Sequence, residues 1–217
     1  MNRKEKDKNI IIKNLQNYIL MFKGNHFIVK NDEPILDNKE QLKFIEENIL
    51  KKLILKNSQK IAYNLLYKAS KDGDNGLSFH NRCDNFSPTL SIFKTKKNII
   101  FGGFTTQNWN CDQEYKKDIY AFCFQLNNKK IYNIKNDINI NAICCRKDNV
   151  PSFYDGKSGW AFIWSVGNFF TSDNNHTCTI QLCGYDNVSQ DYEINNGEQY
   201  YNIAEIEVFQ IIIINEH

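Results

Sequence analysis

The stretch IIFGGFTTQNW, residues 99–109, places two adjacent glycines inside a run of β-branched and aromatic residues. Such a run predicts a strand, and glycine in a strand interior weakens the strand unless something requires the bare backbone. A phosphate-binding loop needs a Lys and then a Ser or Thr at the start of a helix, but no Lys follows here and Thr105 and Thr106 continue the strand pattern. We therefore expect Gly102 and Gly103 to serve packing, at a bulge or beneath a neighbouring side chain such as Trp109.

Short apolar or alternating runs recur about every ten residues along most of the chain, separated by Asn, Asp and Gly. Regular short runs with turn residues between them are typical of an antiparallel β-sandwich or barrel. The predicted strands lie at 61–67, 89–94, 99–106, 120–126, 130–134, 141–146, 159–164, 178–183 and 204–213. Since no helix alternates with these strands after residue 85, we do not expect a Rossmann-type sheet.

Two helices are predicted before the strands become continuous, so the fold class is α+β, mainly β. The first lies within residues 36–55, where Asn38 can cap the helix and a buried stripe is formed by Leu42, Ile45, Ile49 and Leu53. The second is short and lies within residues 74–85; Asp74 or Asn75 would cap it, and Leu77, His80 and Cys83 lie on its neighbouring turns.

Residues 1–32 are interpreted as an N-terminal extension ahead of a domain over 33–217. One face of a predicted amphipathic helix in this extension carries Ile11, Leu15, Tyr18, Ile19 and Phe22, and Gly24 would end it. Such a helix can lie on a membrane surface, dock on a partner or pack on its own domain.

Composition narrows the possible function classes. The formal net charge is only +2, which gives no global argument for binding nucleic acid. No apolar window is long enough for a membrane span, and the N-terminus does not resemble a secretory signal. The seven cysteines are therefore expected to be free thiols in a reducing, cytoplasmic compartment.

Two groups of residues could carry chemistry. His80 and Cys83 are three positions apart and could face the same way on a helix, but no C-x-x-C and no second ligand pair accompanies them, so no metal or cofactor site is predicted. Glu205 and Glu207 lie on one face of the last strand, where a carboxylate pair could serve acid–base catalysis. The structural alternatives are a buried thiol for Cys83 and a solvated strand face for the two glutamates.

The order of several motifs resembles the TLDc domain, the domain of the oxidation-resistance proteins. The resemblance covers roughly residues 34–212. The matching positions are Ser70 and Gly73, Phe79 and Cys83, 88–90, 101–104, Trp109, 121–124 and 205–209. The sequence departs from the family pattern in VPSFYDGKSGWAFIW, residues 150–164, where Tyr154 and Asp155 stand in place of expected glycines.

This resemblance implies two antiparallel sheets packed face to face with a few flanking helices, and it makes Gly73, Gly102 and Gly103 part of the framework. It also implies a link to oxidative-stress resistance and, for several such proteins, binding to the vacuolar-type proton ATPase, without a settled catalytic mechanism. We expect a non-catalytic, monomeric regulatory module on peripheral-sector subunits of that ATPase, at the cytosolic face of acidic organelles. The expected partner-binding residues are Ile11, Leu15, Tyr18, Phe22, Trp109, Tyr154 and Trp160. The alternative is an enzyme or oxidant scavenger that uses His80 with Cys83, or Glu205 with Glu207.

Overall fold

The computed structural model describes residues 34–36, 38–53, 59–135, 141–154, 161–164, 170, 177–178 and 184–215. The chain divides into two compact units, Met1–Asp37 and Asn38–His217. The fold below is that of the second unit. The predicted helix with Ile11, Leu15, Tyr18 and Phe22 lies outside the described residues, as does Trp160.

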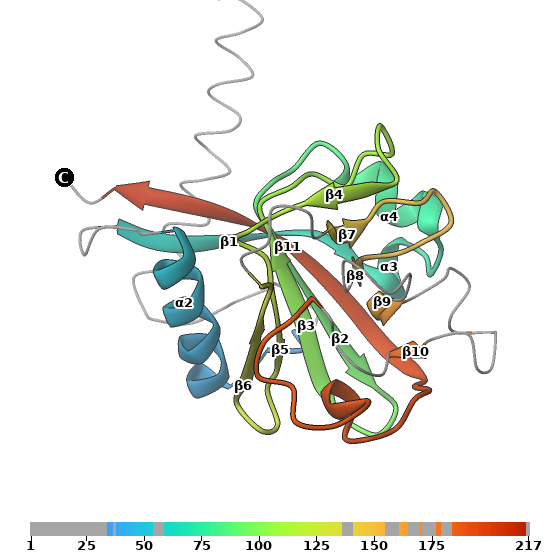
Figure 1. Cartoon of the computed structure of the whole chain (residues 1–217). Helices are drawn as coiled ribbons and strands as arrows, with labels where there is room; N and C mark the ends of the chain where they lie inside the picture. Colours follow the sequence, from blue (N-terminus) through green and yellow to red (C-terminus); the bar gives the residue numbers. More distant parts are fainter. Residues whose placement is uncertain are drawn as a thin grey trace, which may run out of the picture. The chain divides into compact units, whose positions relative to one another are not determined.

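Two antiparallel sheets make up the fold, as the sequence predicts (Figure 1). The first has the strand order β1-β11-β2-β3-β5-β6 and the second the order β10-β9-β8-β7-β4. The strands of the first sheet are β1 (Gln59–Lys68), β2 (Thr89–Thr95), β3 (Ile100–Thr105), β5 (Phe122–Gln125), β6 (Lys130–Asn133) and β11 (Ile203–Asn215). Those of the second are β4 (Tyr115–Lys117), β7 (Asn141–Cys144), β8 (Ser152–Tyr154), β9 (Ala161–Trp164) and β10 (Thr177–Cys178). Most of the predicted strand at 178–183 lies outside the described residues.

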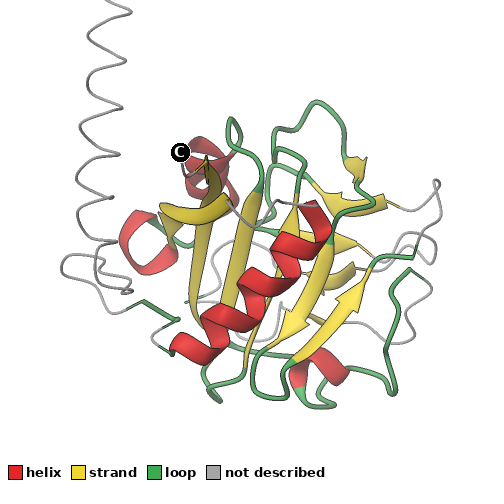
Figure 2. Cartoon of the chain, turned by 90° about the vertical axis from the view of Figure 1, so that its left-hand side faces the viewer, coloured by secondary structure: helices red, strands yellow, loops and turns green. Residues whose placement is uncertain are grey.

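The helices flank these sheets. They are α2 (Lys39–Leu53), α3 (Ala69–Asp72), α4 (Gly76–Cys83) and the 3-10 turn η1 (Glu193–Asn195). Helix α2 lies across one face of the six-stranded sheet (Figure 2), and Ile45 and Ile49 of its predicted stripe are fully buried. Asn38 begins α2 as predicted, because its side chain accepts a hydrogen bond from the Glu40 amide at 2.8 Å. The α3 turn was not predicted; Gly73 ends it with a φ of +107°, a conformation that favours glycine.

Strands β2, β3 and β5 of the six-stranded sheet are buried on both faces, which explains why they read as nearly continuous apolar runs. On β3, Phe101 belongs to the core between the two sheets, whereas the neighbouring Phe104 is equally buried but lies outside that core. The core between the sheets also contains Phe153 of β8 and Ile163 of β9. A strand with one buried face alternates apolar and polar residues. A strand that is buried on both faces has apolar residues at both sets of positions, and so the alternation is lost.

The two adjacent glycines pair in unbroken register, so the bulge allowed by the sequence is absent from β3. Gly102 lies opposite Ile92 and Phe124, and Gly103 lies opposite Ser91 and Cys123. A Cβ on Gly103 would meet the ring of Phe153 at 2.5 Å, and a Cβ on Gly102 would meet the Ser91 carbonyl oxygen at 2.1 Å. The expectation of close packing is confirmed.

The neighbour above Gly103 is Phe153 of the second sheet, and not Trp109 as the sequence suggested. Trp109 packs edge-on against Phe153, with the ring centroids 5.7 Å apart. The bare backbone therefore lets the two sheets approach closely at this point.

Candidate functional site

Helix α4 carries the first group of candidate residues. Asn75 caps it by accepting a hydrogen bond from the Ser78 amide at 2.9 Å, as predicted for this stretch. Phe79 and Cys83 are one helical turn apart and both belong to the core between the sheets. His80 follows Phe79 on the helix, so its side chain points in a different direction, away from the core. There it contacts residues that the sequence analysis did not pair with it.

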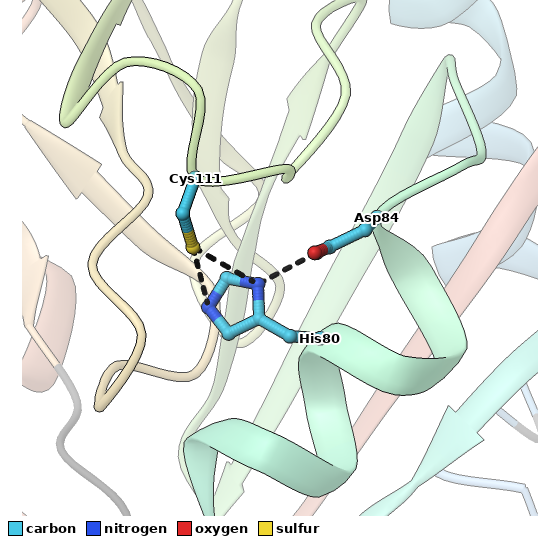
Figure 3. Close-up of side chains that lie close together, drawn as sticks. All are labelled: His80, Asp84 and Cys111. Carbon is cyan, nitrogen blue, oxygen red and sulfur yellow. Dashed lines mark hydrogen bonds and ion pairs between the residues drawn. The ribbon is translucent and has the colours of Figure 1, made fainter.

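His80 lies between an acidic side chain and a thiol (Figure 3), and its ring also contacts a backbone carbonyl. Its Nδ1 is 2.6 Å from Oδ1 of Asp84, and its Nε2 is 3.0 Å from the Arg146 carbonyl oxygen. Sγ of Cys111 is 3.8 Å from Nδ1 and 3.9 Å from Nε2. The sequence pairs His80 with Cys83; the structure places it beside Cys111 and Asp84.

The two hydrogen-bonding partners of His80 decide what its ring can do. An ionised carboxylate and a carbonyl oxygen only accept hydrogen bonds, so both bonds are satisfied together when both ring nitrogens donate. The thiol of Cys111 is nearly equidistant from the two nitrogens and therefore lies along neither diverging N–H direction. This arrangement does not form the aligned base–nucleophile hydrogen bond of an activated thiol.

Cys111 is held in this position by a loop that is organised around a buried ammonium group. The side chain of Lys116 is only 6% exposed and donates hydrogen bonds to Oδ1 of Asn108 and of Asn110. Its Nζ also lies 2.7 Å from Oδ1 of Asp112. Three side chains at alternate positions thus converge on one cation, and this fixes the backbone on both sides of Cys111.

The thiol of Cys111 is partly exposed, in contrast to the other cysteines whose side chains the structure describes. Partial burial and the negative charge of Asp84 raise its pKa, whereas Lys147 and Lys116 lower it by a smaller amount. The electrostatics therefore favour the protonated thiol at neutral pH.

Cys83 is fully buried, and burial raises its pKa far above the usual range of a thiol. It packs in the core cluster that also contains Tyr67 and Phe79. The structural alternative stated for Cys83, a buried thiol that acts as a small apolar group, fits this position.

The two glutamates on the last strand occupy one face, as predicted, but only Glu205 is partly exposed there, whereas Glu207 is buried. Strand β11 lies between β1 and β2, so it is not an edge strand. Glu207 is 1% exposed, with its Oε1 3.1 Å from Nζ of Lys68. Glu205 accepts a hydrogen bond from the Ser70 amide at 3.1 Å. Both carboxylates therefore tie the β1–α3 junction to β11, and the solvated strand face offered as the structural alternative is wrong for Glu207.

Two of the expected partner-binding residues are buried, so the prediction that they would be exposed is wrong. Trp109 is completely buried and donates from Nε1 to Oγ1 of Thr89 at 2.9 Å. Tyr154 is 8% exposed and packs against Tyr115, with ring centroids 4.7 Å apart.

Asp84, Cys111, Lys116 and Arg146 are not among the site residues that the sequence predicts. Asp84 follows His80 by four positions, and that helical spacing is a usable signal for a side-chain pair. No such signal connects Cys111 to His80, because 31 residues separate them. Only the packing of the 106–114 loop against α4 brings them together.

Comparison with known proteins gives one family. A search of curated proteins returns no match to this sequence. No described helix is long and apolar enough to cross a membrane. The family model of the TLDc domain matches residues 30–212, which is most of the chain and contains both sheets except the last three residues of β11. The chain therefore belongs to the TLDc domain family, a family linked to oxidation resistance.

Proposed function

We propose that this protein is a non-catalytic binding module that associates with peripheral-sector subunits of the vacuolar-type proton ATPase and modulates its assembly or activity. Membership of the TLDc family supports the proposal, because the resemblance to that family implies, for several of its proteins, binding to that ATPase. The module would act at the cytosolic face of acidic organelles through its partner.

An exposed apolar pair on a rigid turn is the observation that carries the binding role. Ile119 and Tyr120 follow β4 and are 48% and 41% exposed. Asp118, just before them, is 4% exposed and accepts hydrogen bonds from both Thr105 and Thr106. The same carboxylate accepts a hydrogen bond from the Tyr120 amide at 2.9 Å.

A turn held in this way presents its aromatic and aliphatic side chains in a fixed geometry, so little conformational entropy is lost on binding. Exposed aromatic residues on such a scaffold are the usual anchors of protein interfaces. We therefore assign Ile119 and Tyr120 to the partner-binding surface, in place of the buried Trp109 and Tyr154.

The contacts of the candidate catalytic groups also support a non-catalytic role. Glu207 is neutralised by Lys68, Glu205 caps a backbone amide, and Cys83 lies in the core. Each of these side chains already has a structural partner or a buried place.

Affinity purification of the tagged endogenous protein, followed by mass spectrometry, tests the proposal. We expect stoichiometric peripheral-stalk and catalytic-sector subunits with the unchanged protein, and their loss from the double variant Ile119→Ser/Tyr120→Ser. The matched control is Tyr200→Ser, which alters a tyrosine of 52% exposure elsewhere on the domain and should keep the subunits. A partnerless protein would refute the ATPase proposal, whereas binding by the double variant would refute only the assigned surface.

A second candidate function is oxidant scavenging by a thiol, favoured by the partial exposure of Cys111 beside His80. Alkylation of the folded protein, read by mass spectrometry of the peptides, tests it. Rapid modification of Cys111 would favour scavenging. Resistance of every cysteine in the folded state would remove the chemistry that this candidate needs.

A further inference from the structure

His80, Asp84 and Cys111 form a cluster of three potential metal ligands of different chemistry. One ligand atom of each residue lies within 4.8 Å of the others. Asp84 and His80 come from the end of α4, and Cys111 comes from the 106–114 loop (Figure 3). We propose that these residues bind a divalent transition-metal ion of the zinc class through Nδ1 of His80, Oδ1 of Asp84 and Sγ of Cys111.

A tetrahedral ion on Nδ1 requires two of the three side chains, those of Asp84 and Cys111, to rotate. Zinc bonds of about 2.1 Å to N and O and about 2.3 Å to S place neighbouring N and S about 3.6 Å apart, and N and O about 3.4 Å apart. The observed distance from Sγ of Cys111 to Nδ1 of His80 is 3.8 Å. The Asp84 oxygen is 2.6 Å from Nδ1, so the N–O separation has to grow by roughly 0.8 Å and the oxygen has to leave the line of the Nδ1 lone pair, where the ion would lie. The Cys111 side chain has to rotate toward Nδ1, because its Sγ is nearly equidistant from the two ring nitrogens.

Asp84 has room for this movement. Its side chain is 26% exposed, so a rotation of the carboxylate displaces solvent and does not disturb the core. The His80 side chain, in contrast, is 9% exposed and stays fixed.

The second nitrogen of His80 already has the partner that a metal-binding histidine requires. Metal-ligating histidines usually donate the other ring N–H to a carboxylate or a carbonyl, which fixes the tautomer and the ring orientation. The Arg146 carbonyl oxygen accepts from Nε2 at 3.0 Å. This contact leaves Nδ1 directed at Asp84, and Cys111 lies to one side of that direction.

The donor set and the charge select the class of ion. Mg²⁺ and Ca²⁺ prefer oxygen ligands alone, whereas zinc accepts nitrogen, oxygen and thiolate together. A carboxylate, a thiolate and a neutral imidazole balance the two charges of the ion. Binding releases the Nδ1 proton of His80 and the thiol proton of Cys111 to solvent.

The backbone on both sides of the thiol ligand is held in place by the buried ammonium group of Lys116 described above. Lys116 fixes Asn110 and Asp112 on either side of Cys111, so the loop requires little reorganisation. Since Cys111 is partly exposed, the ion can reach the site from solvent, and a water molecule can complete a fourth position.

Titration of the full chain with Co²⁺, after removal of bound metals, tests the proposal. Cobalt replaces zinc in such sites and gives an absorption band from thiolate to metal. We expect one Co²⁺ per chain with this band, displacement by Zn²⁺, and loss of the band in Cys111→Ser. The affinity of that variant should fall by more than the roughly 100-fold that loss of an outer-shell partner costs.

Two further variants make the test specific. Asp84→Asn should weaken binding while leaving the thiolate band of the bound ion, whereas the exposed Asp148→Asn, with the same change of charge, should bind like the unchanged protein. Circular dichroism confirms that each variant is folded. The proposal is overturned if folded protein gives no thiolate band with Co²⁺, or if the band persists unchanged in Cys111→Ser.

Discussion

Replacing Gly103 by alanine places a methyl group against the ring of Phe153. The added Cβ would lie 2.5 Å from two ring carbons and 2.6 Å from a third. Ordinary carbon–carbon contacts are about 3.5–4.0 Å, so the overlap amounts to about 1 Å. Phe153 is fully buried and packs against Trp109, which prevents the ring from moving away.

The size of the effect follows from two opposing contributions. Overpacking of a dense core costs about 1–3 kcal/mol, and an overlap of this size against a buried ring belongs at the upper end. Alanine also reduces the conformational freedom of the unfolded chain, which raises the free energy of unfolding by about 0.4–1 kcal/mol. We therefore expect Gly103→Ala to lower the free energy of unfolding by roughly 2 kcal/mol, and to lower the Tm by about 4–8 °C for a domain of this size.

Urea unfolding of a double-mutant cycle isolates this contact. Phe153→Leu removes the ring that the methyl group meets, so the double variant should be more stable than the sum of the single effects predicts, by about 1 kcal/mol or more. Gly102→Ala is the matched control, because its Cβ would meet the Ser91 carbonyl oxygen at 2.1 Å, and truncation of Phe153 leaves that contact in place. Wild-type stability of Gly103→Ala, or equal rescue of both alanine variants, would refute this reasoning.

Two other predictions concern charged groups. Replacing either Lys68 or Glu207 alone should cost roughly 3–5 kcal/mol, because it breaks a buried ion pair. The double variant Lys68→Met/Glu207→Leu should cost less than either single change. Urea unfolding measures these losses, and additive losses would contradict the prediction. Burial opposes the ionisation of Glu193, but hydrogen bonds from Lys130 and the Ser189 amide outweigh it and lower its pKa. A lowered pKa in the folded state stabilises the protein above the unfolded-state pKa of about 4.3, and this stability is lost as the pH falls through the folded-state pKa. Glu193→Gln should therefore flatten the decline of stability below about pH 4.3, and an unchanged acid profile would argue against this contact.

The candidate site shows why short-range sequence patterns predict only some of the residues that come together in it. The pairing of His80 with Asp84 follows from helical spacing and needs no knowledge of the fold. The pairing of His80 with Cys83 fails because the two side chains leave α4 in different directions: Cys83 lies in the core, and His80 meets a loop. The position of Cys111 depends on Lys116 and on the contact between the 106–114 loop and α4, which leave no periodic trace in the sequence.

The glutamates on β11 illustrate the same limit for strands. Period-two spacing correctly places Glu205 and Glu207 on one face. Their exposure depends on what packs against that face, and here the Lys68 side chain contacts Glu207 and the Ser70 amide of the α3 turn contacts Glu205. The burial of Trp109 has the same kind of cause, since its position after a strand predicts a loop and the core beneath that loop accepts its ring.

The sequence by itself determined the fold class, most of the strands, the capped helices at Asn38 and Asn75, and the packing role of Gly102 and Gly103. These features depend on residues that are close together in the sequence. The spacing of apolar residues indicates the strands and helices, capping residues indicate where helices begin, and the absence of a side chain on glycine indicates close packing. The tertiary structure alone decided that Phe153 covers Gly103, that Glu207 is buried, and that Cys111 lies beside His80. Each of these contacts joins residues that are far apart along the chain, and their proximity depends on how the two sheets and the loops pack together.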